Sequence, residues 1–292
     1  MSNDDIGARG LTFEQREGVA PLPRQLELGE ISNELRAIVW HIFDVHIEAK
    51  SSSMGGASWI DDPWKSILRE KWVFRDHRLE PYSSRYKDRM ADLKKVVEYG
   101  DYGQFLGLLE WILRRQACPK KFRDHVTWAL VKAKSAYRVI DGDTILAISD
   151  EAEAETMNKV LGELKAAGLT APRTHLKRSA EHLTAGLWAD AVRESVHAVE
   201  SVARLLSPGE TGLGPALHSL EKAARIHPAL KAGFKSIYGY SSDEQGIRHP
   251  LVEDHAAQVD ETDAIFMLGA CASFVSYLIG KGRHAGILGA RQ

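Results

Sequence analysis

Cysteine is scarce in this sequence: Cys118 and Cys271 are the only two among 292 residues, and they lie far apart along the chain. Two thiols cannot build a disulfide framework, and a zinc site made of cysteines needs more of them. Reduced thiols in a cytoplasmic protein fit this usage best. Residues 1–10 are polar and acidic and lack the apolar segment of a signal peptide, so no such leader is expected.

A strong excess of charge is also missing. The formal net charge is −2, so the chain as a whole lacks the basic character of many nucleic-acid-binding proteins. Any contact with RNA or DNA must therefore come from a local patch. The best candidate is a run of basic residues in the N-terminal half, for which the alternative is a solvated helix end and turn: Arg114, Arg115, Lys120, Lys121 and Arg123.

Long hydrophobic runs are few, and one segment comes closest to a membrane span. Residues 264–280 contain no charged side chain, but they fall short of the roughly 20 residues that a span needs. The segment also contains Ser273, Ser276 and Tyr277. We therefore expect a helix buried in a bundle or at a dimer interface, and no membrane contact.

The length leaves room for two modest domains, and helical spacing dominates the first half of the chain. Helices are predicted from residue 33, from Pro63, and over residues 85–98, 102–115 and 119–134, with Trp111 and Trp128 as core residues. The serines and glycines at 51–56 predict a loop. Residues 136–148 differ, because two β-rich runs flank Asp141-Gly142-Asp143, the signature of a tight hairpin.

The second half is helical in pattern. A connector helix and linker are predicted over residues 150–172, followed by helices at 175–185, 187–206, 214–226, 228–238 and 260–281, with Asp260 and Asp263 forming a capping box. The fold class is therefore mainly α. A helical N-terminal domain (1–149) ends in the hairpin, and a bundle of four or five helices fills residues 173–292.

A polar stretch interrupts the second half. Residues 238–255 place an arginine, two histidines and several acids between two apolar helices, and Gly246 and Pro250 predict a shaped turn there. Reactive side chains are commonly carried on such loops. The alternative is an ordinary solvated connection between helices.

Arg248, the adjacent polar His249, and His255 beyond them resemble the arginine–polar–spacer–histidine signature of the HEPN superfamily. Residues 242–249 and 264–274 are similar to the C-terminal domain of AbiJ-like abortive-infection proteins, over about residues 174–281. The hairpin at 136–148 resembles the one that ends the N-terminal domain of those proteins.

This resemblance implies a metal-independent endoribonuclease that acts as an antiviral toxin, with no cofactor. The 2′-hydroxyl of the RNA would attack, Arg248 would clamp the phosphate, and His249 and His255 would transfer protons. Supporting polar residues would be Glu194, Glu200, Asp243 and Glu244. A metal site at His249, Glu253, Asp254 and His255 is not expected, since their spacing differs from helical zinc motifs and Pro250 intervenes.

The resemblance also implies partners: RNA, with tRNA among the candidate substrates, a second copy of the chain, and an antitoxin or another component of a defence system. Small residues at 269, 270, 272 and 273 would let two bundles approach closely. Two other hypotheses stay open. One is a non-catalytic HEPN-like module that binds RNA, a nucleotide or a protein. The other is a loop that a partner nucleotidyltransferase modifies.

Overall fold

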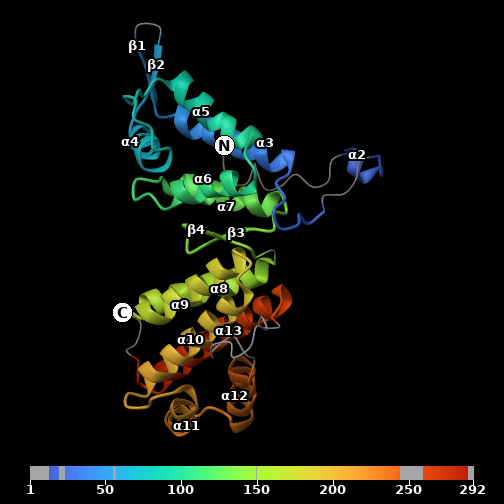
Figure 1. The fold of residues 1–292 in the computed structure, drawn as a ribbon, viewed down its shortest axis with the longest axis vertical. Coiled ribbons are helices and arrows are strands. Elements are labelled where there is room, and N and C mark those ends of the chain that lie inside the picture. Colours follow the sequence, from blue (N-terminus) through green and yellow to red (C-terminus); the bar gives the residue numbers. More distant parts are fainter. Residues whose placement is uncertain (1–12, 20–23, 55–56, 149, 244–258, 289–292) are drawn as a thin grey trace, which may run out of the picture. The chain divides into compact units, whose positions relative to one another are not determined.

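The structure, a computed structural model, describes residues 13–19, 24–54, 57–148, 150–243 and 259–288 (Figure 1). The chain folds into two compact units, Met1–Ala136 and Tyr137–Gln292. The predicted mainly helical class, with a small β-hairpin ahead of a helical bundle, is confirmed.

The first unit is built mainly from helices that enclose an aromatic core. Its helices are α2 (Phe13–Arg16), α3 (Asn33–Glu48), α4 (Trp64–Glu70), the π-helix η1 (Lys71–Arg75), α5 (Tyr86–Tyr99), α6 (Tyr102–Leu113) and α7 (Lys120–Lys132). Phe43, Trp64 and Phe122 are fully buried, and their ring centroids lie 4.9–6.2 Å apart. Edge-on and tilted contacts of this kind stabilise a core beyond the area they bury.

The loop predicted at 51–56 is wrong in part. Ser51–Met54 (β1) and Ala57–Ile60 (β2) pair as an antiparallel hairpin, with Ser51 opposite Ile60. Serines give no alternation of apolar and polar side chains, so the sequence pattern is that of a loop. The two strands are held together by backbone hydrogen bonds, and the identity of the side chains predicts such pairing poorly.

Two histidines meet beside this aromatic core. His46 Nε2 lies 3.0 Å from His125 Nδ1, so one ring donates a hydrogen bond and the other accepts it. The His46 ring also stands edge-on to Phe122, at 5.4 Å between centroids. Burial, and then the nearby His125 and Lys121, lower the pKa of His46 to about 4. The His46 imidazole is therefore neutral in the folded protein near pH 7.

We expect this pair to make the first unit less stable in acid. The unfolded His46 takes up a proton below its ordinary pKa of 6.5, whereas the folded one resists protonation down to about 4. Its contribution is thus complete above pH 6.5 and is lost as the pH falls through that window. The measurement is the melting temperature of the wild type and of His46→Gln between about pH 4 and 6.5. The melting temperature of His46→Gln should depend less steeply on pH. His41→Gln, at an exposed position on the same helix, should keep the wild-type dependence, and equal curves for all three proteins would refute the expectation.

The second unit begins with the predicted hairpin, which is confirmed. Arg138–Ile140 (β3) pairs with Thr144–Leu146 (β4), and the turn places Asp141 and Gly142 at φ values of 58° and 77°. Asp and Gly tolerate this left-handed region better than most residues, which is why they predict the turn. Asp141 also pairs with Arg173, and Asp143 lies 3.2 Å from Lys177 Nζ, so both acids have cationic partners on the helix Thr170–Thr184.

Helices make up the rest of this unit (Figure 1). They are α8 (Glu151–Ala166), α9 (Thr170–Thr184), α10 (Trp188–Leu206), α11 (Leu213–Ala223), α12 (Pro228–Asp243) and α13 (Glu261–His284). Pro172, predicted to close a linker, instead lies in the first turn of α9, where its missing N–H costs no hydrogen bond. α12 continues to Asp243, five residues beyond its predicted end at residue 238.

The hairpin and α8 share a hydrophobic core with the bundle. Ile140, Leu146, Val160 and Leu161 belong to the same buried cluster as the apolar faces of α9, α10 and α13. The predicted domain boundary lies at residue 149, whereas the compact units divide between Ala136 and Tyr137. The hairpin and α8 are therefore structural parts of the second unit.

Helices α9 and α10 form an antiparallel pair that is held by buried hydroxyls. The Ser179 and Ser195 side chains are fully buried, and their oxygens lie 2.6 Å apart. The Ala191 carbonyl lies 2.8 and 2.9 Å from the two oxygens, so one hydroxyl donates to the other and the second donates to this carbonyl. Buried polar groups with all partners satisfied fix one register between two helices.

Helix α13 packs along α10 in the same direction. Gly282, near the end of α13, lies against Leu206, the last residue of α10, and a Cβ added there would come within 2.6 Å of the Leu206 side chain. Farther toward the N-termini of the two helices, Cys271 and Val196 line one pocket. α13 is long and apolar enough by composition to cross a membrane, but half of its apolar window is buried inside the unit. Its buried face belongs to the hydrophobic core of the second unit.

The start of α13 carries the predicted capping box. Asp260 accepts a hydrogen bond from the Asp263 N–H at 2.9 Å, and the Asp263 carboxylate accepts one from the Asp260 N–H. We expect Asp260→Ala to lower the free energy of unfolding of the second unit by about 0.5–2 kcal/mol, since orphan N–H groups lose their acceptor. Asp260→Asn keeps an acceptor and should cost less. Urea denaturation followed by far-UV circular dichroism measures both, and an alanine variant as stable as the asparagine variant would contradict the role of the cap.

Candidate functional site

Most of the residues predicted to carry catalysis lie outside the described residues. These are Arg248, His249, His255 and Glu244, and of Asp243 the structure gives only its place as the last residue of α12. The described chain resumes at the buried Val259, directly before the cap of α13. The proposed roles of these residues thus stay predictions.

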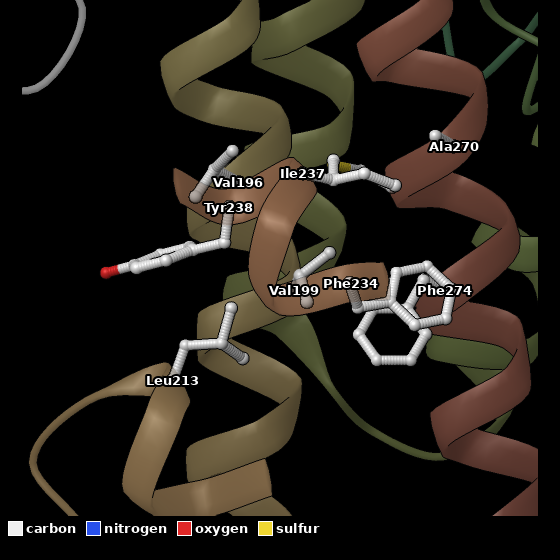
Figure 2. A pocket seen from close by; sticks show the side chains of 9 residues that line it. Val196, Val199, Leu213, Phe234, Ile237, Tyr238, Ala270 and Phe274 are labelled. Carbon is white, nitrogen blue, oxygen red and sulfur yellow. The ribbon is translucent and has the colours of Figure 1, made fainter. Parts of the chain in front are cut away.

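The helix that leads into this segment packs on α10 and α13. Figure 2 shows Phe234, Ile237 and Tyr238 of α12 with Phe274 of α13 and Val199 of α10 around a small apolar pocket. The free volume of that pocket is about 10 Å³, which is room for about one water molecule. The pocket is a small gap that remains where α12 packs against α10 and α13.

A compact polar cluster lies where α9 faces α10. His175 Nδ1 lies 2.7 Å from Glu194 Oε2, and the rings of His175 and His197 are 5.5 Å apart between centroids. One donor atom from each of His175, Glu194 and His197 lies within 4.8 Å of the others. All three side chains are partly buried. Burial lowers the pKa of the His197 imidazole, more than the neighbouring Glu194 raises it.

Helix geometry explains this cluster. Glu194 and His197 stand three residues apart on α10, so they project from the same face. The register that Ser179 and Ser195 fix between the two helices places His175 of α9 opposite that face. The cluster borders an open groove of about 420 Å³, which is lined by His175, His197, Glu200, Ser201 and Arg204.

Two supporting residues predicted from the sequence, Glu194 and Glu200, therefore lie on one side of α10 with His197. Glu194 already has a partner in His175. Their predicted role in holding Arg248 stays a prediction, because that arginine lies outside the described residues. His175 was not among the predicted site residues, since its position opposite Glu194 depends on the pairing of two helices.

The basic residues of the first unit lie largely beside acids or carbonyl groups. Arg114 lies 3.1 Å from Glu110, Arg115 lies 3.5 Å from Glu70, and Lys120 lies 2.8 Å from Asp124. Arg123 donates to the Arg115 carbonyl at 3.0 Å, and Lys121 is exposed. Partial neutralisation weakens the attraction of such a patch for a polyanion. Its predicted RNA-binding role stays a prediction.

Comparison with protein families identifies the N-terminal part of the chain. The model described as AbiJ N-terminal domain 4 matches residues 11–163, more than half of the 292 residues. The chain belongs to the AbiJ family. Membership indicates a function related to abortive infection, and it confirms the AbiJ-type N-terminal domain expected from the sequence. Comparison with curated proteins and with solved structures gives no match.

The AbiJ match runs through the first unit and the β3–β4 hairpin and ends within α8. It does not extend over α9 to α13, where the polar cluster and the Arg248 segment lie. The family therefore supports a defence role for the chain, and the HEPN assignment of the bundle stays a prediction.

Proposed function

We propose that this AbiJ-family chain is an endoribonuclease of abortive infection, which cuts RNA without a metal through Arg248 and His249. The observation that carries the proposal is the family match at residues 11–163, together with the Arg248-His249 pair in the polar segment between α12 and α13. His255 is a third candidate residue.

The proposed cleavage requires three groups from the protein. A base must take the proton of the 2′-hydroxyl, an acid must protonate the leaving 5′-oxygen, and a cation must stabilise the phosphorane. Histidine suits proton transfer near neutral pH, because its ordinary pKa is about 6.5. Arginine keeps its charge and donates two parallel hydrogen bonds to a phosphate. Stabilisation of the developing charge is expected to contribute most to the rate.

A dimer would bring two such segments together and concentrate positive charge that a chain of net charge −2 lacks. Features of α13 support this part of the proposal. Phe266 is 61% exposed, Ser273 is also exposed, and the small Gly269 and Ala270 lie between them, half-buried. Ala272 is buried in the core, so it would not line the contact. RNA, with tRNA among its forms, is the proposed substrate, and cytoplasm the proposed location. An antitoxin or another defence component would hold the protein inactive until infection.

The experiment is cleavage of total RNA and of tRNA by the purified chain, with and without a chelator of divalent metals. Cleavage that persists under chelation, and leaves 2′,3′-cyclic phosphate ends, is the expected result. Ends with a 3′-hydroxyl, or cleavage that chelation abolishes, would refute the mechanism.

A non-catalytic binding module is the second candidate. The observation that favours it is the extent of the family match, which ends at residue 163 and leaves the Arg248 segment unmatched. RNA that binds saturably and stays intact, under conditions where the protein is folded, would support this candidate over the nuclease. Modification of the segment by a partner nucleotidyltransferase is the third candidate, and a mass increase after co-expression would reveal it.

A further inference from the structure

From the α9–α10 groove we infer that His175, Glu194 and His197 form a binding site for a divalent transition metal, with zinc as the favoured ion. In the proposed nuclease only Glu194 has a predicted part, as a support for Arg248, whereas His175 and His197 have none. Within the ranges that the structure describes, they are the one group of three potential ligands whose donor atoms lie within 4.8 Å of one another.

The donor set matches the chemistry of zinc. Two imidazoles and one carboxylate are the protein ligands of a well-known class of zinc sites, which leave a fourth position for water. Calcium and magnesium prefer sets made of oxygens alone, so two histidines argue against them. The Glu194-x-x-His197 spacing is one that helical bundles use to present a carboxylate and an imidazole to the same ion.

The distances require only small adjustments. In a tetrahedral site with bonds of about 2.0–2.2 Å, neighbouring donor atoms lie about 3.4 Å apart. His175 Nδ1 and Glu194 Oε2 are now 2.7 Å apart, and all donor pairs are within 4.8 Å. Shifts of this size are within the reach of side-chain rotation, and the helices need not move.

The surroundings support a preorganised site. The buried Ser179–Ser195 pair fixes the register of the two helices that supply the ligands, which is the support a metal site needs. His175 and His197 line the open groove, so an ion has a path of entry and the fourth position faces solvent. Two cations lie near the groove: Arg193 pairs with Asp190, and Arg204 lines the groove together with Glu200.

The test is zinc titration of the full chain after metal removal, by isothermal calorimetry. We expect saturable binding with one ion per chain, and at least about tenfold weaker binding in His175→Ala, His197→Ala and Glu194→Gln. His218→Ala, which removes a 70% exposed histidine on α11, should bind zinc as the wild type does. Circular dichroism spectra of the apo variants check that each one is folded.

Cobalt gives a second readout that does not depend on activity. The cobalt-loaded wild type should show the intense visible absorption of four-coordinate Co²⁺. The variants at His175, Glu194 and His197 should lose this absorption. The inference would be overturned if the wild type showed no saturable zinc binding. It would also be overturned if the folded ligand variants bound zinc as tightly as the wild type does. RNA cleavage is assayed separately, so failure of the nuclease proposal and failure of the zinc site are distinguishable.

Discussion

Replacing Arg248 by alanine is expected to reduce RNA cleavage by about 10²–10³-fold, since a donor to the transition-state phosphate is lost. His249→Ala should cost about 10²–10⁴-fold through loss of proton transfer. Growth arrest on expression should disappear in both variants. Cleavage rates of the purified proteins, and growth curves at matched protein levels, are the measurements.

The matched control for the arginine is Arg178→Ala, which removes an exposed arginine on α9. It should keep wild-type cleavage and toxicity. His218→Ala serves the same purpose for the histidine. If the Arg248→Ala and His249→Ala proteins both stay toxic and keep cutting RNA, the catalytic assignment is wrong. Loss of activity in the control variants would instead point to a general effect of charge or folding.

Truncation of the aromatic core is expected to have the largest effect on stability. Phe122→Ala should lower the free energy of unfolding of the first unit by about 3–5 kcal/mol, because it leaves a cavity among fully buried rings. Phe122 is fully buried and contacts both Phe43 and Trp64. Urea denaturation followed by tryptophan fluorescence measures this unit, since six of the seven tryptophans precede residue 137.

Phe74→Ala is the control for this prediction. Phe74 lies in η1 and is 68% exposed, so its loss should change stability little. Equal midpoints for the two variants would show that the buried cluster contributes less than its packing implies.

Local signals explain which parts of the fold the sequence predicts well. The Asp260–Asp263 capping box and the Asp141-Gly142 turn each depend on a few neighbouring residues, and both form as expected. Helical spacing of apolar residues found α3 and the helices of the bundle. The β1–β2 hairpin escaped prediction because its serines lack a pattern. The predicted α12 included Ile237 and Tyr238, which pack in the bundle. It ended too early because Ser241, Ser242 and Asp243 are residues typical of loops.

The candidate site was predictable only within one helix. The spacing of Glu194 and His197 places them on a common face of α10, and this much follows from the sequence. His175 joins them because α9 folds back in one particular register, which the buried serine pair fixes. No short-range pattern encodes such a meeting of two helices.

The family match ends within α8, yet α8 and the β3–β4 hairpin contribute side chains to the core of the second unit. An exchange of C-terminal bundles between relatives, by recombination or by engineering, would therefore have to preserve the apolar complementarity of these elements. A junction placed between residues 136 and 137 would avoid that constraint, whereas one at residue 163 would cut α8 before its buried Leu164.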